Sequence, residues 1–185
     1  MELILASASP RRKELLTNAG FKFSIIPAEI DETFISGISA YENVKRVSNL
    51  KALEIFKNYP NSIVLASDTI VVYDDVVYGK PKDEADAYKM LRLFSGKTHY
   101  VLSGVSIVSK DKVDNFVIES KVTFKDLTDE DIYNYINSGE PYGKAGSYAI
   151  QGLGGNLVLK YEGELENIIG LPIKEIIPIL KGYGL

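Results

Sequence analysis

The chain has 185 residues, a length that fits one domain with a sizeable hydrophobic core. Its 21 Lys and Arg residues against 25 Asp and Glu give a net charge of −4, which argues against a nucleic-acid backbone as partner for the whole surface. Cysteine is absent, which excludes disulfides, thiolate metal sites and a cysteine nucleophile, and no apolar run approaches the roughly 18 residues of a membrane span. We therefore expect a cytoplasmic protein with a single domain over residues 1–185, bound to neither nucleic acid nor membrane.

The chain opens with an apolar run over residues 3–6 that predicts a short buried strand. A helix is expected directly after it, because Ser9 is a good N-cap, Pro10 suits the first helical position and Gly20 is a plausible stop. The sequence therefore indicates a strand that turns sharply into a helix.

The first turn of this expected helix carries three cations, Arg11, Arg12 and Lys13. The helix dipole is positive at this end, so the cations should cost about 1 kcal/mol in total. A bound phosphate would reverse that sign, since free N–H groups at a helix N-terminus and arginine side chains both bind phosphate. A solvated basic face is the alternative interpretation.

The rest of the chain alternates between helical and strand patterns. Helices are expected over about 40–58, 83–93, 130–137 and after Pro172, and strands over 62–73, 76–78, 100–108, 113–124 and 156–160. Two of the strand pairs read as hairpins. The sequence thus predicts an α/β fold with a long mixed central sheet, flanking helices and two lobes around a cleft.

Asp68 interrupts an otherwise apolar strand, between residues 63–67 and 69–72. Strands disfavour Asp, and a buried carboxylate is costly without a cation, a metal or a hydrogen-bond donor. A catalytic or metal-binding carboxylate fits this position, and an Asp bonded to backbone N–H groups at a bulge is the alternative. Asp31 and Glu32 lie in a loop that could share a metal with Asp68, or could be an ordinary polar loop.

Four further polar residues fit either a functional or a structural role. Lys51 on the second helix fits either a site or a solvated face. Lys80 is presented by a Gly-Lys-Pro loop, which fits either a site or an ordinary basic loop. Gln151 is presented by a tight loop, where its amide could pair with the imide edge of uracil or thymine or simply stabilise the turn. His99, the only histidine, is expected to be structural.

Taken together, these residues form a set of motifs that resembles the Maf family of nucleoside triphosphate pyrophosphatases, in order and over nearly the whole chain. The motifs are Ser7-x-Ser9-Pro10-Arg11-Arg12, Asp31-Glu32-Thr33, Arg46 with Lys51-Ala52, Ser67-Asp68-Thr69, Gly79-Lys80-Pro81, Ser95-Gly96-Lys97-x-His99, Lys144-Ala145-Gly146, Ile150-Gln151-Gly152 and Gly170-Leu171-Pro172.

The resemblance implies a fold like that of the inosine triphosphate pyrophosphatases, a homodimer, a divalent cation (Mg²⁺ or Mn²⁺), and cleavage of a nucleoside triphosphate to the monophosphate and pyrophosphate. Arg11, Thr69 and Gln151 look like the specificity residues of the dTTP/UTP branch of the family. The branch that acts on 7-methyl-GTP usually has an aromatic residue at the first of these positions and an acidic one at the third, and it is the nearer alternative.

The resemblance also implies roles for individual residues. Asp68 would be catalytic and would hold the metal together with Glu32, while the phosphates would be bound by Ser9, Arg11, Arg12, Lys51 and Lys80. A nucleotide-binding regulator of cell division without turnover is the alternative from another class. Two positions depart from the family pattern: Gly143 replaces a common Asp, and Leu165 replaces an aromatic residue.

Overall fold

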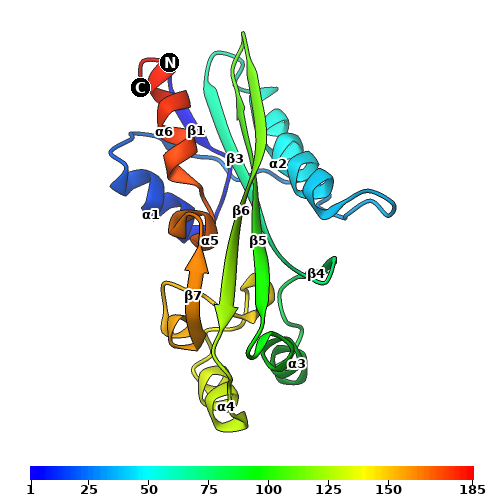
Figure 1. The fold of residues 1–185 in the computed structure, drawn as a ribbon. Helices are drawn as coiled ribbons and strands as arrows, with labels where there is room; N and C mark the ends of the chain where they lie inside the picture. The colour runs from blue at the N-terminus through cyan, green and yellow to red at the C-terminus, as the bar shows by residue number, and fades with distance from the viewer. The chain divides into compact units, whose positions relative to one another are not determined.

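A seven-stranded mixed sheet organises the structure, a computed structural model that describes residues 1–185 (Figure 1). Its strands are β1 (Leu3–Leu5), β2 (Ser24–Ile25), β3 (Ile63–Tyr73), β4 (Val76–Tyr78), β5 (Thr98–Val108), β6 (Val113–Phe124) and β7 (Val158–Glu162). The order is β2-β1-β3-β5-β6-β7, and β4 pairs with β3. β1 is parallel to β2 and β3, whereas the β3–β4 and β6–β7 pairs are antiparallel.

Six α-helices and two 3₁₀ segments complete the fold. They are α1 (Pro10–Asn18), α2 (Ala40–Phe56), α3 (Glu84–Phe94), α4 (Asp129–Asn137), α5 (Leu165–Ile169), α6 (Ile173–Gly182), η1 (Ala145–Ser147) and η2 (Leu153–Leu157). The predicted α/β class with a long mixed sheet and flanking helices is confirmed. The sequence reading missed β2 and α5, which have two and five residues and are too short to show a period.

The chain forms two compact units, which confirms the expected two lobes. The first unit contains Met1–Thr69, Ser103–Ile118 and Gly170–Leu185, and the second contains Ile70–Leu102 and Glu119–Ile169. β3, β5 and β6 each contribute residues to both units. The assignment of residues 1–185 to one domain and the cleft stay predictions.

The first unit buries both faces of its central strands. On one face, Leu3 and Leu5 pack with residues of α1 and α6, including Leu16 and Leu180. On the other face, Ile4 packs with residues of α2 (Figure 1). Burial on both faces explains why the β1 segment is apolar throughout rather than alternating with polar residues.

The second unit has its own core, formed by α3, α4 and the strand segments beside them. Aromatic rings fill its centre: the rings of Phe94, Phe124 and Tyr148 surround the ring of His99 at centroid distances of 4.5, 5.1 and 5.4 Å. His99 is fully buried, and its Nε2 lies 2.8 Å from the Tyr148 hydroxyl. This placement agrees with the structural role expected for His99.

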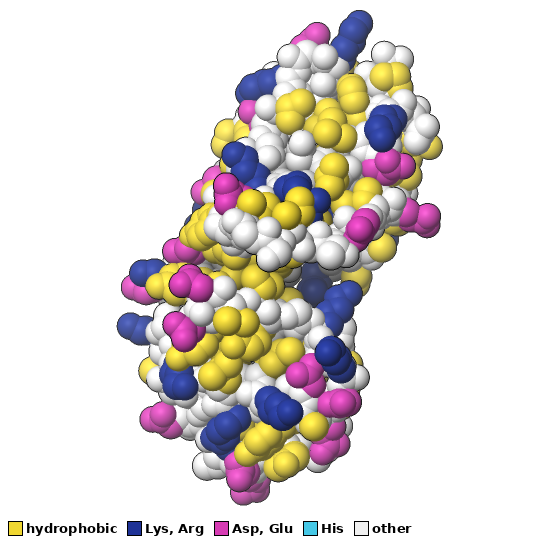
Figure 2. All heavy atoms as spheres, turned by 90° about the vertical axis from the view of Figure 1, so that its right-hand side faces the viewer, with side chains coloured by type: hydrophobic (Ala, Val, Ile, Leu, Met, Phe, Trp, Pro, Cys, Tyr) yellow, Lys and Arg dark blue, Asp and Glu magenta, His cyan; other side chains and the backbone are white.

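One face of the molecule mixes charges of both signs. On the face shown in Figure 2, basic and acidic side chains are interspersed among apolar ones, and no extended field of one sign is visible. None of the helices combines the length and the apolar character that crossing a membrane requires.

Candidate active site

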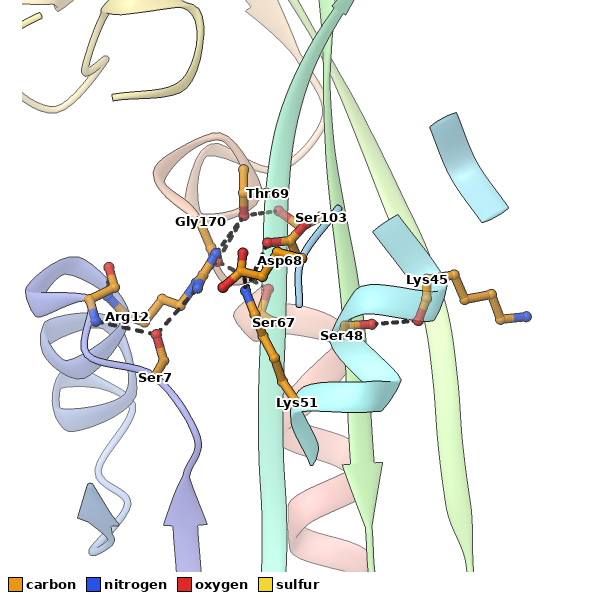
Figure 3. A network of polar contacts seen from close by, with 12 residues as sticks. Ser7, Arg12, Lys45, Ser48, Lys51, Ser67, Asp68, Thr69, Ser103 and Gly170 are labelled. Atoms are coloured by element: carbon orange, nitrogen blue, oxygen red, sulfur yellow. Dashed lines mark hydrogen bonds and ion pairs between the residues drawn. The ribbon is translucent and has the colours of Figure 1, made fainter. Parts of the chain in front are cut away.

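Asp68 lies in the middle of β3 with its side chain 13% exposed. Its Oδ1 accepts a hydrogen bond from Lys51 Nζ at 3.0 Å, across from α2 (Figure 3). The buried carboxylate is therefore compensated by a cation, as the cost of burying a charge requires, rather than by backbone N–H groups at a bulge.

Lys51 also contacts the second predicted carboxylate. Its Nζ lies 3.0 Å from Glu32 Oε2, and the Lys51 side chain is 10% exposed. The interpretation of Lys51 as a solvated residue on the helix surface is therefore wrong. One ammonium group bridges two carboxylates that come from a loop and a strand, so the local charge of the three groups is −1.

The loop that carries Glu32 is hydrogen-bonded to α2 through two residues that follow Glu32, Thr33 and Ile35. Asn43 accepts a hydrogen bond from Ile35 N at 2.8 Å and donates one to Ile35 O at 3.0 Å. Arg46 Nη2 donates to Thr33 O at 2.6 Å. These bonds hold the backbone around Glu32 and so help to set where its carboxylate lies.

Arg12 connects α1 to β3 and to the segment before α6 (Figure 3). Its Nε donates to Gly170 O at 2.8 Å, Nη1 to Ser7 Oγ at 3.2 Å and Nη2 to Thr69 Oγ1 at 3.1 Å. The guanidinium retains further N–H groups for a ligand. Arg12, which is predicted to bind phosphate, thus also links three segments of the first unit to one another.

Burial affects the pKa of both arginines of the first helical turn. Burial lowers the pKa of Arg12, and neighbouring Arg11 lowers it further, whereas Asp68 and Glu32 raise it in part. Burial alone lowers the pKa of Arg11. An arginine remains charged at neutral pH in any case, so this end of α1 presents two partly desolvated positive charges, an arrangement suited to an anion.

The start of α1 follows the sequence closely. Ser9 is the N-cap and its side chain accepts from Arg12 N, Pro10 stands in the first turn, and no acidic residue lies there. The first turn of α1 therefore supplies no negative charge of its own to the helix N-terminus, which a bound anion would provide.

Thr69, a predicted specificity residue, has a hydroxyl that is already fully engaged. It accepts from Arg12 Nη2, contacts Ser103 Oγ at 2.9 Å and donates to Gly170 O at 3.3 Å. A hydroxyl has one donor and two acceptor positions, and these contacts use them all. The Thr69 hydroxyl therefore helps to hold the Arg12 side chain in place.

The carboxylates of Glu32 and Asp68 fit a divalent cation of the Mg²⁺ type. The chain contains no cluster of three or more metal-binding side chains. Mg²⁺ is usually held by one or two carboxylates together with waters and substrate phosphates, so a pair of carboxylates with an excess negative charge is a suitable donor set. Lys51 already neutralises part of that charge.

The other two predicted site residues belong to the second unit. Lys80 is exposed in the loop after β4, and the loop is fixed by a hydrogen bond from Gly146 N to Gly79 O at 3.1 Å. Gln151 is exposed in a turn closed by a bond from Gly152 N to Ala149 O at 3.1 Å. Both residues are presented by fixed backbone, as their sequence context predicts.

Sequence reasoning missed several residues that organise the site. Asn43 gave no signal beyond its place at the start of a helix, and Ser103 lies in an unremarkable strand. Gly170 was noted only as part of a motif, yet its carbonyl oxygen accepts from Arg12, Ser67 and Thr69. A backbone acceptor leaves no trace in the residue type, so only the structure identifies it.

The chain is similar to known proteins over nearly its whole length. The model of the Maf-like protein family matches residues 2–183. A dTTP/UTP pyrophosphatase of Geobacillus sp. (strain WCH70) is 44% identical over 99% of this chain and 98% of that protein. A dTTP/UTP pyrophosphatase of Bacillus mycoides (strain KBAB4) is 46% identical over 98% of this chain and 95% of that protein. Among solved structures, the Staphylococcus aureus Ham1 protein aligns with a TM-score of 0.45 at 16% identity, over 68% of this chain and 73% of that one.

Proposed function

Because this chain belongs to the Maf-like protein family, we propose that it is a nucleoside triphosphate pyrophosphatase that hydrolyses dTTP and UTP to the monophosphate and pyrophosphate. The match of the family model to residues 2–183 confirms the resemblance found in the sequence. The relatives named dTTP/UTP pyrophosphatase support the substrates, and the ion cluster of Asp68, Lys51 and Glu32 supports the chemistry.

In this proposal, Asp68 accepts the proton of the attacking water. The water oxygen forms a bond to the α-phosphorus, the bond from that phosphorus to the α–β bridging oxygen breaks, and pyrophosphate leaves. Asp68 is suited to this role because its side chain pairs with Lys51 and lies in the middle of β3.

The cationic side chains neutralise the charge that develops on the phosphate oxygens. Arg11, Arg12 and Lys51 do so from the first unit, and Lys80 is assigned the same role. Ser9 and the start of α1 hold the leaving pyrophosphate. A divalent cation, Mg²⁺ or Mn²⁺, held by Glu32 and Asp68, would polarise the phosphate oxygens.

Base selection is assigned to Gln151, with Arg11 and Thr69 as further specificity residues. The carbonyl of a glutamine amide accepts from the N3–H of uracil or thymine while its NH₂ group donates to a ring carbonyl. The exposed position of Gln151 in a closed turn leaves its amide accessible to a ligand. Modified pyrimidine nucleotides that keep this edge are included among the proposed substrates. A cytoplasmic location, a homodimer, a role in limiting the incorporation of modified nucleotides and a link to cell-division arrest stay predictions.

The test is pyrophosphate release from a panel of canonical and modified nucleoside triphosphates, with and without Mg²⁺ or Mn²⁺. We expect metal-dependent turnover of dTTP and UTP above the other nucleotides. Preferred turnover of 7-methyl-GTP would place the enzyme in the other branch of the family. Nucleotide binding by folded protein without release of pyrophosphate would contradict the proposal and favour a regulator.

A further inference from the structure

A single carboxylate, Glu140, holds the turn that carries Gln151. Glu140 Oε1 accepts a hydrogen bond from Leu153 N at 2.9 Å, and Oε2 accepts one from Gly154 N at 2.8 Å. Glu140 lies outside the turn, in the segment after α4. The turn is therefore not held by its own residues alone.

The hydroxyl of Tyr135 forms hydrogen bonds both to Glu140 and to the other end of the turn. It donates to Glu140 Oε2 at 2.7 Å and accepts from Ala149 N at 3.2 Å. The backbone N–H groups of residues 149, 153 and 154 thus converge on one carboxylate–phenol pair, with Gln151 between them.

Two glycines of the turn allow this close approach. A Cβ atom at Gly152 would overlap Glu140 Oε1, and one at Gly154 would lie 2.8 Å from the Tyr135 hydroxyl. Glycine at these two positions therefore makes room for the side chains of Glu140 and Tyr135, which hold the turn. Without these side chains, the Gly-Leu-Gly-Gly segment would be free to adopt other conformations.

The protonation state of both groups agrees with the hydrogen bonds. Burial raises the pKa of the Glu140 carboxyl, but the bonds from Tyr135 and from the N–H groups of Gly154 and Leu153 outweigh it and lower the pKa overall. Burial first, and then the bond to Glu140, raises the pKa of Tyr135. At neutral pH an ionised carboxylate accepts from a protonated phenol, which is the state that the contacts require.

We propose that Glu140 is a positioning residue for base selection, acting with Tyr135 through the backbone of the Gln151 turn. Gln151 is exposed, so the direction of its amide depends on the backbone of the turn that carries it. This inference rests on the proposed function, since it assigns to Gln151 the reading of the uracil or thymine edge.

The experiment compares Glu140→Gln with Glu130→Gln, a matched change at an exposed position of α4 in the same unit. A glutamine keeps the size of Glu140 but cannot accept from both N–H groups, because one of its two polar atoms is itself a donor. The readouts are kcat and KM for dTTP, UTP and dCTP, together with amide hydrogen exchange at Leu153 and Gly154.

We expect Glu140→Gln to lower the preference for dTTP over dCTP, measured as the ratio of kcat/KM values, by about tenfold. The loss should come mainly from KM for dTTP, and exchange at Leu153 and Gly154 should become faster, while Glu130→Gln behaves like the wild type. Faster exchange with an unchanged preference, or equal losses for all nucleotides, would overturn the inference while leaving the proposed function intact.

A second variant keeps the test decisive if Glu140→Gln does not fold. Tyr135→Phe retains the carboxylate and the aromatic ring but removes the acceptor for Ala149 N, and we expect a smaller loss of preference, about threefold. An unchanged preference in folded Tyr135→Phe would then count against the inference. A wild-type enzyme that does not favour dTTP over dCTP would refute the proposed function, and the inference with it.

Discussion

At the scale of single residues, Asp68 carries the largest expected effect. Asp68→Asn removes the base while keeping the shape, so we expect turnover of dTTP to fall by about 10²- to 10⁴-fold with little change in KM. Asp111→Asn, an exposed change in the turn between β5 and β6, is the matched control. Steady-state kinetics and circular dichroism on both variants provide the measurement, and normal hydrolysis by folded Asp68→Asn would contradict the mechanism.

Lys51 offers a test of the metal site that does not depend on turnover. Lys51→Met leaves Glu32 and Asp68 without the ammonium that separates them. We expect the variant to lose about 2 kcal/mol of unfolding free energy in the presence of a chelator, or about 6 °C in Tm. Because like charges then face each other, Mg²⁺ should raise the Tm of the variant more than that of the wild type. Equal shifts in both proteins would argue against a cation at these carboxylates.

At the scale of elements, the loop before α2 is as important as the strand that carries Asp68. Asn43→Ala removes both hydrogen bonds to Ile35 from a buried position, so we expect a loss of about 2 kcal/mol in unfolding free energy and a higher concentration of Mg²⁺ for half-maximal activity. Asn58→Ala, an exposed change just beyond α2, is the control. Denaturant titrations and metal titrations measure the two effects; an unchanged metal requirement in Asn43→Ala would show that the loop does not position Glu32.

Some elements and contacts of this fold can be predicted from the sequence, and others cannot. Long periodic segments such as α2 and β3 are predictable because one face or both faces are apolar, and Asp68 stands out because it breaks such a pattern. The pairing of Lys51 with Asp68 is not predictable in this way, since it depends on which turn of α2 lies over β3. The hydrogen bonds to Gly170 are also not predictable from the sequence, because the acceptor is its backbone carbonyl oxygen.

At the scale of the whole molecule, the core of the second unit should make stability depend on pH. Burial lowers the pKa of His99 from 6.5 to about 3, so the folded state keeps the ring neutral where the unfolded state protonates it. The contribution of His99 to stability is therefore full above pH 6.5 and is lost as the pH falls toward 3, by about 1.4 kcal/mol per pH unit.

The variant His99→Gln isolates this contribution. As the pH falls from 6.5 toward 3, the unfolding free energy of the wild type should fall relative to that of the variant by about 1.4 kcal/mol per pH unit. Urea denaturation at a series of pH values measures this change. A difference that is independent of pH would show that the ring is protonated in the folded state, or that it is not buried.

The assembly of the first unit from distant segments determines the order in which the chain can fold on the ribosome. β1 emerges before the other strands, but Leu3 and Leu5 share their core with Leu171 and Leu180, which emerge after the whole second unit. The second unit needs nothing beyond Ile169, so it is complete earlier. A nascent chain whose residues up to about 169 have left the ribosome should therefore hold a finished second unit beside an N-terminal segment whose apolar strand is still uncovered. At that moment in synthesis, this segment is the natural binding site for a chaperone.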